Sequence, residues 1–221
     1  SIFNKDDTSI YTTNEGEVEF LNTASLTSND SILVADFKLK ASGKLDIRTS
    51  GTYLYSTIKY DTTFKYNVGY SVLSKPLITS SRDNIFNINL PINSIDNDAY
   101  IVVGKNALTS KNSINNENAQ SDVYTVSPVK HKLSSPAQIS FDLKNIESED
   151  ISIGYWNGEL WEELLTYQSV DKATAYANTE FLGHFALIKK GSGSYLSTIN
   201  DQTIPTEYSL SQNYPNPFNP E

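Results

Sequence analysis

The sequence predicts an all-β fold, with two tandem antiparallel β-sandwich domains followed by an extended C-terminal tail. Three observations lead to this fold class. Apolar residues recur at every second position in many short segments. Aromatic residues, which suit a half-buried pleated surface, include 14 tyrosines and 9 phenylalanines. Apolar residues at helical spacing are nearly absent, and polar turn formers separate the segments, which favours sandwiches over a parallel α/β sheet.

The alternation defines the predicted strands, because successive side chains of a strand point to opposite faces of its sheet. Near the N-terminus, one apolar face comprises Leu33, Ala35, Phe37 and Leu39, and residues 53–58 and 64–72 continue the pattern. Further along, the apolar faces comprise Phe86, Ile88 and Leu90; Ile139, Phe141 and Leu143; Ile151, Ile153 and Tyr155; and Phe185 and Leu187. Each set predicts a strand with one face in a core.

Two breaks divide the chain into domains. Pro76 cannot donate a hydrogen bond to a central strand, so we place the first sandwich at residues 1–76. The alternative is that both halves share one core. The segment Gly191-Ser192-Gly193-Ser194 has the composition of a flexible linker. The second sandwich is therefore predicted at 77–190, the linker at 191–203 and the tail at 204–221.

Composition excludes several functions. The net charge is -9 and the sequence has no basic run, which argues against a nucleic-acid partner. Cysteine is absent, so disulfides and thiolate nucleophiles are excluded. No apolar run approaches the roughly 20 residues that cross a bilayer, so we expect no membrane span. Methionine is absent too, so we expect that Ser1 is not a translation start and that a segment was removed upstream.

The end of the sequence carries a dense motif. After Ile204-Pro205-Thr206-Glu207 come the residues Asn213, Tyr214, Pro215, Asn216, Pro217, Phe218, Asn219 and Pro220. This stretch resembles the start of the type A sorting domain of bacterial type IX secretion substrates. The resemblance implies that the outer-membrane secretion machinery is a partner and that the protein is extracellular or lies at the outer cell surface. We expect the sorting domain to continue beyond Glu221.

Residues 77–190 carry a second resemblance. The segments that carry it are Ala99-Tyr100-Ile101-Val102-Val103, Val123-Tyr124-Thr125-Val126-Ser127-Pro128, Ile153-Gly154-Tyr155-Trp156-Asn157-Gly158 and Leu182-Gly183-His184-Phe185. Their order is similar to that of the β-sandwich module of ankyrins and netrin receptors. This sequence departs from the family where Val129-Lys130 replaces the usual glycine. The resemblance implies a module without catalytic residues that binds other protein domains.

Tyr155, Trp156 and Trp161 are the candidate partner-contact residues. Asn157-Gly158 between the tryptophans predicts a type I′ hairpin turn, because both residues tolerate positive φ. An aromatic pair across such a hairpin stabilises it. We expect one tryptophan in the core and the other as an exposed cap, available to a protein partner or, alternatively, to a sugar ring.

Catalytic and metal sites are not predicted. His184 is expected to be a hydrogen-bonded strand residue and His131 a solvated turn residue, and no nucleophile elbow accompanies either. The acidic clusters, which we place in solvated turns, are Glu147, Glu149 and Asp150; Glu162 and Glu163; and Asp96 and Asp98. Calcium at Asp96-Asn97-Asp98 is the alternative, although the spacing is not that of a dedicated calcium loop. We expect no cofactor.

Together these features predict a non-catalytic structural or interaction region of an exported bacterial protein. Its partners would be other protein domains or copies of itself, assembled through edge strands. The alternative is an accessory or carbohydrate-binding module of a larger secreted hydrolase, such as a subtilisin-like protease or glycanase. Surface glycans would then be the partner.

Overall fold

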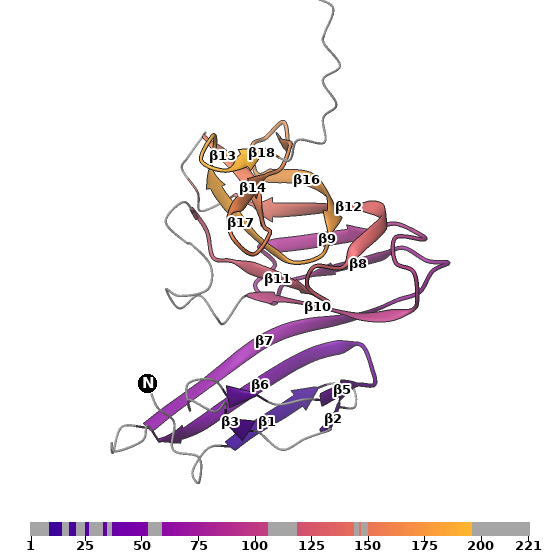
Figure 1. Cartoon of the computed structure of the whole chain (residues 1–221), viewed down its shortest axis with the longest axis vertical. Helices are drawn as coiled ribbons and strands as arrows, with labels where there is room; N and C mark the ends of the chain where they lie inside the picture. Colours follow the sequence, from indigo (N-terminus) through magenta and orange to yellow (C-terminus); the bar gives the residue numbers. More distant parts are fainter. Residues whose placement is uncertain are drawn as a thin grey trace, which may run out of the picture.

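The computed structural model confirms the all-β fold class (Figure 1). It describes residues 9–14, 18–20, 25–26, 33–34, 37–52, 59–105, 119–143, 146 and 150–195, and in these residues it contains strands and no helix. The strands are β1 (Ser9–Asn14), β2 (Val18–Phe20), β3 (Ser25–Leu26), β4 (Leu33–Val34), β5 (Phe37–Leu39), β6 (Gly43–Thr52), β7 (Lys59–Ser71), β8 (Leu77–Ser80), β9 (Phe86–Leu90), β10 (Ala99–Lys105), β11 (Tyr124–Ser127), β12 (Lys132–Asp142), β13 (Ile151–Trp156), β14 (Trp161–Glu163), β15 (Thr166–Gln168), β16 (Thr174–Phe181), β17 (His184–Lys189) and β18 (Ser194–Tyr195).

Two sheets contain most of these strands. The larger has nine strands in the order β1-β6-β7-β10-β11-β17-β13-β14-β18, and the smaller has five in the order β15-β16-β12-β9-β8. Neighbouring strands are antiparallel except β14 and β18, which are parallel. Two further pairs, β2 with β5 and β3 with β4, are separate from the sheets. In Figure 1, the five-stranded sheet lies in the upper body together with β10, β11, β17 and β13.

The apolar core lies between the two sheets. From the small sheet it receives the inward side chains Phe86, Ile88, Leu90, Ile139, Phe141, Ala175 and Ala177. From the large sheet it receives Ile101, Val103, Tyr124, Val126, Ile153, Tyr155, Phe185 and Leu187. The alternating apolar positions of β9 and β12 therefore point inward as predicted, because each strand presents every second side chain to the facing sheet. Phe86 is central, with its ring centroid 5.1 Å from that of Phe141 and 5.5 Å from that of Tyr124.

The large sheet also buries part of its other face. A second apolar cluster there contains Val123, Trp156, Trp161, Ala186 and Ile188. All six residues of β13 are buried as a result. The expectation that β13 and β17 bury only one face is therefore wrong, since these strands supply side chains to both clusters.

Strand β7 continues the large sheet across the predicted domain boundary. It pairs with β6 over residues 59–68 and with β10 over residues 66–71. The predicted break at Pro76 falls in the turn between β7 and β8. The buried residues of the main core cluster nevertheless run from Phe86 to Leu187, with the partly buried Leu77 packed against them. The two halves thus share a sheet, while this core belongs to the second half.

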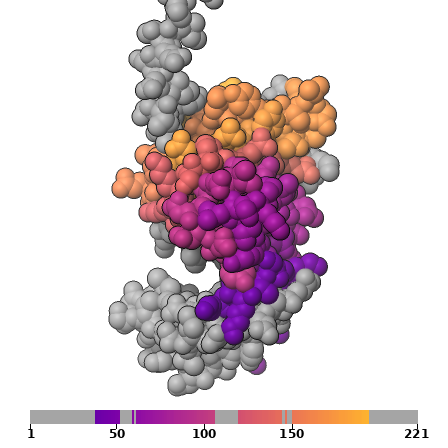
Figure 2. Space-filling view, turned by 90° about the vertical axis from the view of Figure 1, so that its right-hand side faces the viewer, coloured from indigo at the N-terminus to yellow at the C-terminus, as the bar shows by residue number. Residues whose placement is uncertain are grey.

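Figure 1 shows β1, β6 and one end of β7 below the body that holds the five-stranded sheet, and Figure 2 shows the indigo residues of β6 in the same low position. Contacts link this part to the β8–β9 turn. The Asn67 amide donates a hydrogen bond to the Ser80 carbonyl (2.7 Å), and Arg82 lies 3.4 Å from the Asp46 carboxylate.

Two strand predictions near the N-terminus have different outcomes. Residues 33–39 form two short strands, not one, because β4 pairs with β3 while β5 pairs with β2. Residues 64–71 of the predicted 64–72 strand lie in β7. The predicted strand at 53–58 lies outside the described residues.

Candidate functional site

The two tryptophans face each other across the β13–β14 hairpin. Trp156 and Trp161 are directly opposite in register, with ring centroids 5.4 Å apart and planes inclined at 64°. Four residues, 157–160, connect the strands, so the predicted two-residue type I′ turn is wrong. The Asn157 side-chain oxygen accepts hydrogen bonds from the backbone N–H groups of Glu159 (2.9 Å) and Leu160 (3.0 Å). This Asx turn replaces the tighter turn.

Both tryptophans are buried. Trp156 is 7% exposed and Trp161 is 4% exposed, packed in the second cluster with Val123, Ala186 and Ile188. The expected exposed cap is therefore wrong for both. Tyr155 points to the opposite face of β13 and is buried in the main core, where its ring stacks on Phe181 at 5.8 Å. None of the three candidate contact residues presents an open ring face in this structure.

Glu162 and Glu163 lie on strand β14, so their predicted turn location is wrong. Glu163 is buried, and its carboxylate accepts hydrogen bonds from the Ser152 hydroxyl (2.7 Å) and the Gly191 N–H (2.8 Å). Glu162 accepts a hydrogen bond from the Asn157 amide at 2.8 Å. Because a buried carboxylate needs such donors, Glu163 fixes the turn after β17 to the hairpin.

The histidines differ from each other. The His184 Nδ1 atom lies 2.8 Å from the Thr125 hydroxyl on the neighbouring strand, which confirms the predicted hydrogen-bonded strand histidine. Burial lowers the pKa of His184, and the positive charge of Lys130 lowers this pKa further. The sequence predicts that His131 is a solvated turn residue. Its Nε2 atom is instead buried without a hydrogen-bond partner among the described residues, because the segment around it pairs with Leu182.

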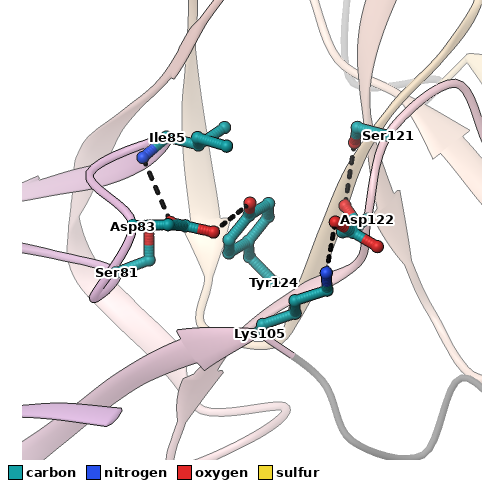
Figure 3. A network of polar contacts seen from close by, with 7 residues as sticks. All are labelled: Ser81, Asp83, Ile85, Lys105, Ser121, Asp122 and Tyr124. Carbon is teal, nitrogen blue, oxygen red and sulfur yellow. Dashed lines mark hydrogen bonds and ion pairs between the residues drawn. The ribbon is translucent and has the colours of Figure 1, made fainter. Parts of the chain in front are cut away.

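A polar network that the sequence did not predict surrounds Asp83 (Figure 3). The Tyr124 hydroxyl donates to the Asp83 carboxylate at 2.8 Å, and the Ser81 hydroxyl and the Ile85 N–H also donate to it. Burial acts to raise the pKa of Asp83, but these hydrogen bonds outweigh burial and lower it. Burial, followed by the hydrogen bond to Asp83, raises the pKa of Tyr124. A neutral phenol bonded to an ionised carboxylate ties the β8–β9 turn to β11. The polar turn Ser81-Arg82-Asp83-Asn84 was the only sequence signal.

The remaining acidic residues form no metal centre in the described part of the chain. Asp96 and Asp98 lie in an exposed turn, where Asp96 accepts a hydrogen bond from Ser134 (2.6 Å) and Asp98 one from the Leu73 N–H (3.1 Å). Among the described residues, no group of three or more histidine, cysteine, aspartate and glutamate side chains is placed to hold a metal ion. Glu147 and Glu149 lie outside those residues.

Exposed apolar residues gather around β15, which is an edge strand of the five-stranded sheet. Leu165 precedes this strand and is 62% exposed, and Val170 follows it and is fully exposed at 106%. Edge strands offer unpaired backbone groups, and exposed apolar residues beside them favour contact with another chain. We define Leu165, Val170 and strand β15 as the β15 edge.

No family model matches this chain, and a search of curated proteins found no match. The described residues contain no helix long and apolar enough to cross a membrane. The sorting-motif residues 213–220 and residues 196–203 of the predicted linker lie outside the described part of the chain. The first residues of that linker are not a free segment, because the Gly191 N–H is bonded to Glu163 and Ser194–Tyr195 form β18 beside β14.

Proposed function

We propose that this chain is a non-catalytic structural and interaction region of an exported bacterial protein, located at the outer cell surface or secreted. Export is supported by the Asn213-Tyr214-Pro215-Asn216-Pro217-Phe218-Asn219-Pro220 motif, which resembles the type IX sorting signal. The motif is a property of the sequence and lies outside the residues that the structure describes.

A non-catalytic role is supported by what the polar side chains of the sandwich do. Glu163 and Asp83 each accept hydrogen bonds that join one strand or turn to another. His184 is bonded to Thr125 on the neighbouring strand. These hydrogen bonds hold strands and turns together, which supports a structural role for Glu163, Asp83 and His184.

The β15 edge is the observation that carries the interaction role. Two large aliphatic side chains, Leu165 and Val170, flank an edge strand and are mostly or wholly exposed. These side chains are aliphatic and have no polar atoms to desolvate. Each Å² of apolar surface that they bury in an interface contributes about 25 cal/mol to the free energy of association. A second copy of this chain, or a neighbouring domain, that adds a strand at β15 would bury both residues.

Light scattering during size-exclusion chromatography tests this function. We expect the wild-type protein to self-associate in a concentration-dependent manner. The double variant Leu165→Lys, Val170→Lys should elute as a monomer with an unchanged melting temperature, because exposed lysines at an edge prevent strand pairing. Leu160→Lys is the matched control, since Leu160 is also exposed but lies in the β13–β14 loop, and it should still associate. A wild-type protein that is monomeric at every concentration would contradict self-association.

A further inference from the structure

The outer face of the five-stranded sheet carries an ordered pattern of uncharged side chains. One row across the strands consists of Asn178, Gln138, Asn89 and Ile78, which are aligned in register on β16, β12, β9 and β8. A parallel row consists of Tyr167, Tyr176, Ser140, Asn87 and Ser80. These outward residues alternate with the core residues of the same strands. We call the two rows the amide–tyrosine strip.

The amides of the strip are available to a ligand. Asn89, Gln138 and Asn178 are exposed, and within the described residues no hydrogen bond engages their side chains. Each amide offers two donors and one acceptor. Because adjacent strands are about 4.8 Å apart, the three amides repeat at that spacing along a straight line.

Two stacked tyrosines provide an aromatic surface at the β15–β16 end of the strip. The rings of Tyr167 and Tyr176 stack at a centroid distance of 5.7 Å, with planes inclined at 24°. Tyr167 is 51% exposed, so a large part of this side chain is open to solvent. An aromatic face of this kind packs against flat apolar surfaces, while its hydroxyl remains able to hydrogen-bond.

Charge restricts the ligand. The chain carries a net charge of -9, yet neither row of the strip contains a charged residue. Asp142 and Glu180, the next outward residues on β12 and β16, lie beyond the rows. An acidic protein repels polyanions, and neither row of the strip supplies a cation to compensate. The strip therefore matches an uncharged ligand with many hydroxyl groups.

We propose that the amide–tyrosine strip binds an extended neutral polysaccharide, a role that goes beyond the structural function proposed above. The sugar hydroxyls exchange hydrogen bonds with the row of amides, and one sugar ring stacks on the ring of Tyr167. The spacing of the amides is close to the length of one sugar unit in an extended β-linked glycan, so successive units meet successive strands. A protein partner would favour a more apolar centre than this strip provides.

Affinity electrophoresis and calorimetry with neutral soluble glucans test the proposal. The probes are a β-1,3-glucan, hydroxyethylcellulose as a β-1,4-glucan, and glycogen as an α-linked glucan, with alginate as the polyanion. We expect at least one neutral β-glucan to bind and alginate not to bind. Tyr167→Ala should weaken this binding roughly tenfold because it removes the ring that stacks on a sugar. Gln138→Glu should weaken it to a similar degree because it replaces the amide donor with a charged carboxylate. Tyr70→Ala, an exposed tyrosine of the other sheet, is the control and should bind normally.

The strip and the β15 edge share Tyr167, so variants at residues that belong to only one of the two surfaces distinguish them. Leu165→Lys, Val170→Lys should retain glucan binding even as a monomer, and Gln138→Glu should retain self-association. Because both tryptophans are buried, glucan addition should leave their fluorescence unchanged. The proposal is overturned if no neutral glucan binds, if only alginate binds, or if Tyr167→Ala and Gln138→Glu bind as the wild type does. It is also overturned if these two variants lose only self-association, which would make the strip an interface between copies.

Discussion

Asp83 shows how a single polar residue stabilises this sandwich. Its carboxylate accepts hydrogen bonds from Tyr124, Ser81 and Ile85, so one side chain holds a turn of the small sheet against a strand of the large one. Tyr124 is almost completely buried, and its ring lies 5.5 Å from Phe86. A buried hydroxyl without an acceptor would destabilise the folded state, so Tyr124 and Asp83 depend on each other.

At this scale we expect Tyr124→Phe to lower the free energy of unfolding by about 1 kcal/mol, because it removes the hydrogen bond and keeps the ring. Urea denaturation measures the loss, and Tyr176→Phe, whose ring stacks on that of Tyr167 on the outer face, should be nearly neutral.

The same pair should make stability depend on pH. Burial acts to raise the pKa of Asp83, but hydrogen bonds hold it below 3.8. The contribution of Asp83 to the free energy of unfolding is therefore complete above pH 3.8 and is lost as pH falls through the lower folded-state pKa. The difference between Tyr124→Phe and wild type should therefore shrink in that acidic range. A difference that is constant down to pH 2 would contradict the role of the ionised carboxylate.

Among the elements, β7 determines how the two parts of the chain are joined. Its first ten residues pair with β6, and its last six pair with β10. On the outer face, Tyr66 of β7 lies opposite Gly104 of β10. A Cβ at position 104 would lie 2.4 Å from the Tyr66 ring and 2.8 Å from the Lys65 carbonyl oxygen, so glycine is required for this close approach.

We accordingly expect Gly104→Ala to lower the free energy of unfolding by about 1–3 kcal/mol, since it forces the β7 backbone and the Tyr66 ring to move. Gly69→Ala is the matched comparison in β7 itself. Its Cβ would lie 2.9 Å from the two Cδ atoms of Leu77, a side-chain end that can rotate away, so its effect should be smaller. Thermal melts of both variants provide the measurement. Equal losses would show that the β7–β10 contact has no special packing requirement.

For the whole molecule, we expect folding and export to be determined by different parts of the chain. The core cluster that holds the two sheets together lies within residues 77–187. The predicted sorting motif at residues 213–220 lies beyond the described sandwich. A change in the motif is therefore expected to alter the destination of the protein and leave the sandwich folded.

Replacement of residues 213–220 with a glycine–serine segment tests this expectation in a bacterium that has a type IX secretion system. We expect the complete gene product to reach the cell surface or medium and the altered protein to remain in the periplasm. Replacement of residues 196–203 in the same way is the control for tail length and should not block export. Immunoblots of cell fractions and medium measure the outcome. Equal export of both altered proteins would refute the sorting assignment.

The sequence by itself determined the features that depend on local pattern. Period-two alternation at Phe86, Ile88 and Leu90 identifies an inward face, because side-chain direction in a strand follows from the backbone alone. The same local argument identified His184 as a strand residue with a hydrogen bond.

Only the tertiary structure decided which strands pair and what covers each face. Both tryptophans are buried because β13 and β14 are interior strands of the large sheet, and their outer face packs with Val123, Ala186 and Ile188. Glu163 is buried because the distant Ser152 and Gly191 supply its donors. The alignment of Asn89, Gln138 and Asn178 likewise depends on pairing between residues far apart in the chain. The physical reason is that a strand pattern specifies a buried face but not the partner strand, which is chosen by packing of the whole chain.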